Sequence, residues 1–334
     1  MDKEAIGRIF TPAARAALAS FPIDAGELTP ISLSENVTFK VVDRHDGTAY
    51  VLRLHRPGYH TLDELISERA WIRALGDAGV VVPSPVRARD GQDYVPVTIP
   101  ASGEQRFAGL ARWTEGRLLA GVLAGASDDR VIEAYFSQLG AIVAAMHNQA
   151  SGWSPPPGFT RHALDRDGLM GDAPHWGPFW EHRSLSPAER GLLLDARGRM
   201  RELLTGLSRD PSVYSLIHAD LHPGNILVAG DRLTVIDFDD AGFGWHQYDI
   251  AVVLMYWQFK PNAADIDRAF LGGYRAHRPI PDDVLASIPA FRLIRGLAGI
   301  GWLHQRPELK SPPAFEERKA WVLEQCAALQ RSRP

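Results

Sequence analysis

The chain has 334 residues, of which 45% are hydrophobic and 23% charged, and a formal net charge of −4. This composition is typical of a globular protein of about two domains, and its slight acidity argues against nucleic-acid binding. The single cysteine, Cys326, excludes an internal disulfide framework, so we expect a cytoplasmic protein. We expect no secretory signal and no membrane contact, because charged residues precede any apolar run and no stretch of about 20 apolar residues stands out.

The first third of the chain is expected to be rich in strands. The expected elements are a helix over residues 5–21, strands over 31–42 and 50–55, a helix from Thr61 to about Leu75, and a strand pair over 93–113. Asp46-Gly47 predicts a hairpin turn between the first two strands. Thr61-Leu62-Asp63-Glu64 is a capping-box pattern that begins the helix.

The rest of the chain is expected to be mainly helical. An amphipathic helix is predicted over residues 127–148, and a proline-rich loop follows at 154–158. Strands before helices predict an α+β protein with two lobes. We place the boundary near Trp113 to Gly116, with an N-lobe over residues 1–113 and a C-lobe over 114–334.

The most informative stretch is His218-Ala219-Asp220-Leu221-His222-Pro223-Gly224-Asn225, an HxDxxxxN pattern. Pro223-Gly224 breaks any helix, so Asp220 is expected on a loop. Val235-Ile236-Asp237-Phe238-Asp239-Asp240 follows shortly after. An Asp that meets an attacking hydroxyl, with an Asn and a second Asp that hold magnesium, is the core of a kinase-type phosphoryl-transfer site. Each of these residues alone would fit a capped turn or a strand end equally well.

A hairpin is expected to bring the two metal ligands together. Residues 226–228 and 233–236 are β-prone runs, and the turn residues 229–232 lie between them. Asn225 and Asp237 would then lie at the same end of the hairpin and offer the oxygen ligands that magnesium prefers. Of the two following aspartates, Asp239 points the same way as Asp237 and is the better candidate to assist the metal.

The stretch from Leu216 to Leu227 resembles the catalytic loop of the aminoglycoside phosphotransferase and choline kinase superfamily, and Val235 to Asp240 resembles its metal-binding strand. The resemblance implies a two-lobed, protein-kinase-like fold that phosphorylates a hydroxyl with ATP and Mg²⁺. It implies that Asp220 is the catalytic base, with Asn225 and Asp237 as the magnesium ligands. Asp249 is expected to be structural and to accept hydrogen bonds from the catalytic loop.

A carboxylate lies within the apolar stripe of the helix that begins at Thr61. Glu68 shares a face with Leu65 and Ile72, and a buried carboxylate needs a partner. In the kinase fold that partner is a basic residue on the preceding strand, oriented toward the α- and β-phosphates. Arg53 stands at this position, where the family that the chain resembles usually has Lys. Lys40, on the previous strand, is the alternative basic residue. The alternative, an ion pair between Glu68 and an arginine at the solvent edge without a role in catalysis, stays open.

The expected nucleotide-binding loop, residues 31–39, contains no glycine. Ser34 and Asn36 would have to supply the donors to phosphate that a glycine-rich loop provides through its backbone. An ordinary polar turn is the alternative interpretation. The adenine is expected near residues 110–113, which include Arg112 and Trp113.

The acceptor is expected to be a small molecule with a hydroxyl group, whose identity the sequence does not contain. Arg292 and Arg295 on the C-terminal helices make an anionic group on the acceptor conceivable, and a structural salt bridge is at least as compatible. A Ser/Thr protein kinase is one alternative, because residues 53–57 and 236–241 look similar to a bacterial stress-response kinase of the same superfamily. A pseudokinase is the other. ATP versus GTP and the oligomeric state stay open.

Overall fold

The computed structural model of the protein describes residues 3–33, 36–309 and 314–331. The described chain divides into two compact units. The first unit comprises residues 1–122, 154–161 and 224–239, and the second comprises 123–153, 162–223 and 240–334. Two short segments beyond residue 122 therefore belong to the first unit, whereas we expected one boundary near Trp113 to Gly116. The β10–β11 hairpin explains part of this difference, because β10 pairs with β7.

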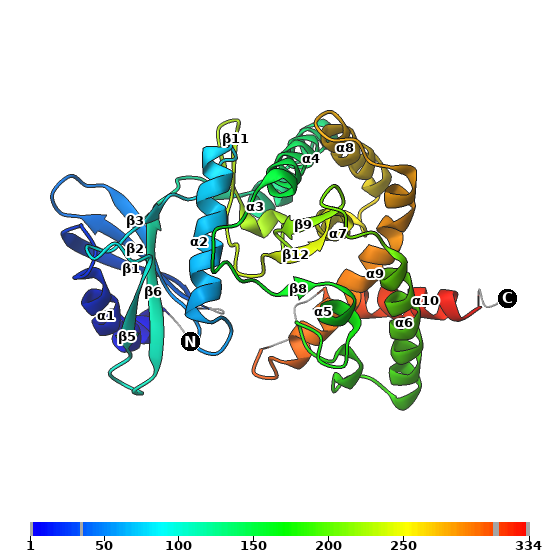
Figure 1. Ribbon diagram of the computed structural model, residues 1–334, viewed down its shortest axis with the longest axis horizontal. Coiled ribbons are helices and arrows are strands. Elements are labelled where there is room, and N and C mark those ends of the chain that lie inside the picture. The colour runs from blue at the N-terminus through cyan, green and yellow to red at the C-terminus, as the bar shows by residue number, and fades with distance from the viewer. Residues whose placement is uncertain (1–2, 34–35, 310–313, 332–334) are drawn as a thin grey trace. The chain divides into compact units, whose positions relative to one another are not determined.

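The elements follow one another in the order shown in Figure 1. They are α1 (Lys3–Leu18), β1 (Ala25–Leu33), β2 (Val37–Asp43), β3 (Ala49–Leu54), α2 (Leu62–Asp77), β4 (Pro85–Val86), β5 (Tyr94–Thr98), β6 (Gln105–Arg112), β7 (Arg117–Leu118), α3 (Leu119–Ala124), α4 (Asp129–Gly152), β8 (Ala163–Leu164), α5 (Arg166–Met170), η1 (Phe179–Glu181), α6 (Pro187–Gly206), β9 (Tyr214–Ile217), η2 (Pro223–Asn225), β10 (Ile226–Ala229), β11 (Arg232–Val235), β12 (Gly242–Trp245), α7 (His246–Trp257), α8 (Ala263–Arg275), α9 (Asp282–His304) and α10 (Phe315–Arg331).

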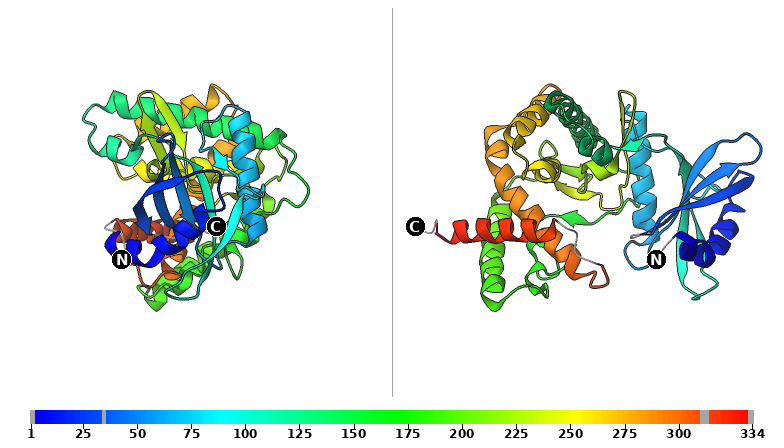
Figure 2. Two further views of the ribbon diagram at one scale, coloured as in Figure 1. Left: turned by 90° about the vertical axis from the view of Figure 1, so that its left-hand side faces the viewer. Right: turned by 180° about the vertical axis from the view of Figure 1, so that it is seen from behind.

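An antiparallel sheet forms the centre of the first unit, with the strand order β1-β2-β3-β6-β4 and with β5 also paired to β6. Side chains on β2 and β3 alternate between buried and half-buried positions. The buried set includes Phe39 and Leu52, which pack in one core with Phe10 of α1. Helices α1 and α2 lie on opposite sides of this sheet (Figures 1 and 2). The half-buried face, which carries Lys40 and Arg53, therefore points away from the α1 core.

The sequence predicted most local features of this unit correctly. The turn between β2 and β3 contains Gly47 at φ 72°, and both strand pairs are present. Thr61 caps α2 in a complete capping box with Glu64, which satisfies backbone donors that the first turn leaves open. The single strand expected over residues 31–42 is wrong, because β1 ends at Leu33 and β2 begins at Val37.

The second unit is mainly helical. One of its cores joins residues of α6, α7, α9 and α10, among them Leu193, Tyr248, Leu297 and Val322. A small sheet with the order β8-β12-β9 was not expected from the sequence. Its strands have only two to four residues, too few for a periodic pattern to be recognised.

Helix α9 corrects one further expectation. Among the described residues, it is the one helix whose length and apolar composition would allow it to cross a membrane. Its Leu293, Ile294 and Leu297 are buried in the core of the second unit. We attribute its apolar composition to core packing, because a helix that is apolar all round is also what a buried core position requires.

Candidate active site

The β10–β11 hairpin brings two of the expected ligands together within the first unit. Ile226 pairs with Val235, and the backbone N–H of Ile236 donates to the carbonyl oxygen of Asn225 at 2.9 Å. Asp237 follows at once, with φ 66° in the left-handed region, and its side chain is 39% exposed. The expected convergence of Asn225 and Asp237 at one end of the hairpin is therefore present.

The donor set at this end suits a magnesium ion. Asp237 provides a carboxylate that solvent can reach, and the side chain of Asn225 offers an amide oxygen from a buried position. Mg²⁺ takes oxygen ligands from only one or two protein carboxylates and completes its shell with water and phosphate. Asn225 and Asp237 fit this requirement.

Arg53 is held by two aspartates of the same segment. Its Nη2 lies 2.9 Å from Oδ1 of Asp237, and its Nη1 lies 3.4 Å from Oδ1 of Asp239. Burial opposes ionisation of Asp239, but the charges of Arg53 and then His55 lower the pKa of this carboxyl below its ordinary value. Arg53 thus points from β3 toward the segment that carries the expected metal ligand Asp237, as expected for a phosphate-binding cation.

Asp239 organises the expected nucleotide-binding loop rather than standing free for a metal. The side-chain amide of Asn36 donates to Oδ2 of Asp239 at 2.8 Å, and its own oxygen accepts from the backbone N–H of Arg56 at 2.9 Å. The backbone oxygen of Asp239 lies 2.7 Å from Nε2 of His60. Asn36 therefore tethers its loop to the segment after Asp237. Ser34 lies outside the described residues.

Glu68 is buried, as its place in the apolar stripe predicted, but the expected direct pair with Arg53 is absent from the described contacts. Its Oε2 is buried without a hydrogen-bond partner among the described residues. Its neighbour Arg69 donates instead to the Tyr94 hydroxyl at 2.9 Å. Burial, followed by the charge of Asp239, raises the pKa of Glu68 to about 7. Asp237 and Asp239, which lie within hydrogen-bond distance of Arg53, hold its guanidinium in place of Glu68.

Lys40 does not take the place of Arg53. Its ammonium lies 3.6 Å from Glu115 and 4.5 Å from the centre of the Trp113 ring. The Trp113 indole nitrogen is buried without a hydrogen-bond partner among the described residues. Arg112 is exposed at the end of β6, with its guanidinium 5.8 Å from the Tyr50 ring. An adenine-binding role for Arg112 and Trp113 stays a prediction.

Asp220 belongs to the second unit, where Arg295 of α9 holds it. The Nη2 of Arg295 lies 2.5 Å from Oδ1 of Asp220. Burial opposes ionisation of Asp220, but the charge of Arg295, followed by that of His222, lowers the pKa of this carboxyl well below its ordinary value. Asp220 is therefore an anion at neutral pH and can accept a hydrogen bond from a hydroxyl.

Asp249 anchors the loop that carries Asp220. Its carboxylate accepts from the backbone N–H of His218 at 2.9 Å and of Ala219 at 2.6 Å. Ala219 has φ 67°, a conformation that costs a non-glycine residue about 1–2 kcal/mol and needs support from its surroundings. The expectation that Asp249 accepts hydrogen bonds from the catalytic loop is met by these contacts.

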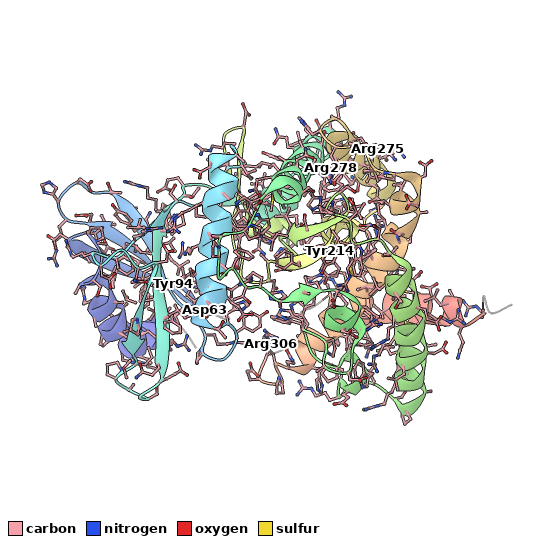
Figure 3. The ribbon with its side chains drawn as sticks, viewed as in Figure 1. Asp63, Tyr94, Tyr214, Arg275, Arg278 and Arg306 are labelled. Atoms are coloured by element: carbon pink, nitrogen blue, oxygen red, sulfur yellow. The ribbon has the colours of Figure 1, made fainter. Side chains whose placement is uncertain are left out.

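His147 of α4 completes this buried network, and the sequence analysis missed it. Its Nε2 lies 3.3 Å from Oδ2 of Asp249, and its Nδ1 lies 2.9 Å from the Tyr274 hydroxyl. Burial, and then the charge of Arg278 (Figure 3), lower the pKa of His147 well below its ordinary value. A neutral His147 thus donates to Asp249 and accepts from Tyr274. His147 lies four residues after the buried Val143 on α4, so the helical period places both on the buried face. This spacing was the signal that could have identified it.

Comparison with known proteins supports this interpretation. The sequence profile of the phosphotransferase enzyme family matches residues 27–280. A solved microcompartment-associated aminopropanol kinase is 31% identical, with a TM-score of 0.79 over 96% of this chain and 97% of that one. A homoserine kinase of Methylobacillus glycogenes is 28% identical over 88% of this chain and 84% of its own length. An amicoumacin kinase solved with AMP-PNP and Ca²⁺ shares the fold, with 23% identity and a TM-score of 0.77 over 97% of this chain and 96% of that one. One curated relative is matched over only 60% of its length.

Proposed function

Because the chain belongs to the phosphotransferase enzyme family, we propose that it is a kinase that transfers the γ-phosphate of ATP to the hydroxyl of a small molecule. The observation that carries this proposal is that Asp220 is ionised and fixed in position. A half-buried arginine partner keeps it ionised, and Asp249 fixes the loop on which it lies. Phosphoryl transfer passes through a loose transition state, so catalysis depends mainly on such positioning and on charge stabilisation.

Each residue has a distinct role in this proposal. Asp220 orients the acceptor hydroxyl and takes its proton late in the reaction. Asn225 and Asp237 hold Mg²⁺, which when bound would neutralise charge on the transferring phosphoryl group. Arg53 contributes a further positive charge toward the phosphates.

A small-molecule acceptor is favoured over a protein acceptor. The relatives reported above are named for homoserine, aminopropanol and amicoumacin, all of them small molecules. The similarity to a stress-response protein kinase stays an unsupported prediction. The pseudokinase alternative is opposed by the presence of Asp220, Asn225 and Asp237 together. A cytoplasmic location stays a prediction, which rests on the single cysteine, Cys326.

A transfer screen with γ-labelled ATP tests the proposed function. The acceptors would be amino alcohols, hydroxy acids, sugars, aminoglycosides and the protein itself. We expect magnesium-dependent labelling of at least one small molecule and no labelling in the Asp237→Asn variant. Labelling of protein alone, or of nothing while ATP still binds, would overturn the proposal.

A further inference from the structure

The guanidinium of Arg295 lies where an acceptor must approach. It is 2.5 Å from the carboxylate that we propose as the base, and the side chains of Arg295 and Asp220 are 22% and 23% exposed. The pair is therefore partly open to solvent and not sealed in the core. A group bound to Arg295 would hold the rest of its molecule beside Asp220.

Asp220 uses only part of the hydrogen-bonding capacity of Arg295. A guanidinium carries five N–H donors in a planar fork that matches a carboxylate. Nη2 donates to Asp220, and the ring of Trp176 lies 5.7 Å from the guanidinium carbon. Tyr248, which stacks on Trp176, is a further neighbour that acts on Arg295. A cation with aromatic neighbours and spare donors is suited to bind a planar anion.

The charges around Arg295 are of both signs. Asp220 acts on Arg295 most strongly, and Asp240 acts on it more weakly. Arg318 of α10 adds a second positive charge. Partial loss of hydration, followed by the charge of Arg295, lowers the pKa of Arg318. Arg318 and Arg295 repel each other, and an anion bound to Arg295 would reduce this repulsion.

We propose that the acceptor of this kinase is a hydroxy acid whose carboxylate binds to Arg295. This inference rests on the proposed function and names its substrate class. The hydroxyl oxygen forms a bond to the γ-phosphorus, and the bond from that phosphorus to the bridging oxygen of ADP breaks. The hydroxyl proton passes to Asp220 and then to solvent. Arg295 contacts the acceptor but not the transferred group, so it determines specificity.

Two matched acceptor pairs isolate the carboxylate. Homoserine and 3-amino-1-propanol differ only by the carboxylate, and so do threonine and 1-amino-2-propanol. For each pair, the ratio of kcat/KM with and without the carboxylate is measured at saturating ATP. We expect the wild-type ratio to be at least 10 for the pair whose hydroxyl is better placed for transfer, because hydrogen bonds to charged groups contribute about 1.5–3 kcal/mol.

The variants Arg295→Gln and Arg295→Lys test the residue. Removal of Arg295 also alters Asp220, but this effect is common to both members of a pair and cancels in the ratio. We expect Arg295→Gln to bring the ratio near 1 and Arg295→Lys to retain part of it. Arg292→Gln is the matched control, since Arg292 lies one turn earlier on α9 and pairs with Asp267. It should keep the wild-type ratio.

Other outcomes separate this inference from the proposed function. A wild-type ratio near or below 1, or a ratio that Arg295→Gln leaves unchanged, overturns the inference while the kinase assignment stands. If none of the four compounds is phosphorylated, the same ratio is measured as binding affinity by calorimetry, and equal affinities within each pair overturn the inference. Absence of metal-dependent ATP turnover with every hydroxyl compound overturns the proposed function instead.

Discussion

Arg53 donates through Nη2 to Oδ1 of Asp237 at 2.9 Å, so the proposed phosphate-binding cation and the proposed metal ligand are direct partners. A carboxylate has two oxygens and about four acceptor positions, so Asp237 can bind Arg53 and a metal ion at once. Arg53 would then lie next to the metal-bound phosphates without a large movement. In the proposed site, Asp237 orients Arg53, whereas we expected Glu68 to do so.

We predict that Arg53→Gln raises KM for ATP by about 10- to 100-fold, because it removes charge-assisted hydrogen bonds that each contribute about 1.5–3 kcal/mol. Arg53→Lys should recover part of the loss, since Lys binds phosphate as a point charge. Steady-state kinetics at fixed acceptor concentration provide the measurement. Arg44→Gln, which breaks an exposed pair with Asp24, should behave like wild type. Equal KM values in all four proteins would remove Arg53 from the nucleotide site.

We predict that Asp237→Asn abolishes magnesium-dependent ATP turnover and leaves the protein folded. Asn tolerates the left-handed backbone at φ 66° nearly as well as Asp, so the loss comes from the missing charge and not from backbone strain. Turnover is titrated against Mg²⁺, with circular dichroism as the check on folding. Asp231→Asn, at the exposed turn of the same hairpin, is the control. Turnover like that of wild type in Asp237→Asn would exclude Asp237 as the ligand.

We predict that Asp220→Asn lowers kcat by about 10² or more and leaves KM for ATP nearly unchanged, because this residue meets the acceptor and not the nucleotide. The measurement is steady-state turnover with the best acceptor from the transfer screen. The opposite pattern, in which ATP use weakens while kcat stays normal, would give Asp220 a different role.

Glu68 predicts a pH-dependent stability. Its pKa rises from 4.5 in the unfolded chain to about 7 in the folded one, so folding favours its protonated form. The folded state is therefore progressively destabilised as pH rises from about 4.5 to 7, by on the order of 3 kcal/mol. Glu68→Gln lacks this titration. Denaturant unfolding of both proteins between pH 4 and 8 should show the variant gaining stability relative to wild type as pH rises, and a constant difference would contradict the burial argument.

We predict that His147 acts as a positioning residue through Asp249. His147→Phe leaves the Asp249 carboxylate without one of its donors, which costs about 1–3 kcal/mol and loosens the loop that carries Asp220. We expect kcat to fall by about 10-fold or more while KM for ATP changes little, in assays run well below the unfolding temperature. His147→Gln, whose amide can donate to Asp249, should restore part of kcat. A loss of stability with unchanged kcat would make His147 a purely structural residue.

The local sequence determined much of this protein. The hairpin around Asp237, the capping box at Thr61 and the burial of Glu68 follow from turn chemistry, side-chain capping and helical period, which act over a few residues. The HxDxxxxN pattern indicated the reaction class for the same reason, since Asp220 and Asn225 lie only five positions apart in the chain. These features need no knowledge of what packs against them.

Only the tertiary structure decided which residues these groups contact. Arg53 had several carboxylates within reach, and it bonds Asp237 and Asp239, 184 and 186 positions away, rather than Glu68. Arg295 meets Asp220 across 75 positions, and His147 meets Asp249 across 102. The strength of an ion pair or hydrogen bond depends on distances and burial that arise only when separate elements pack, so no local pattern specifies the partner.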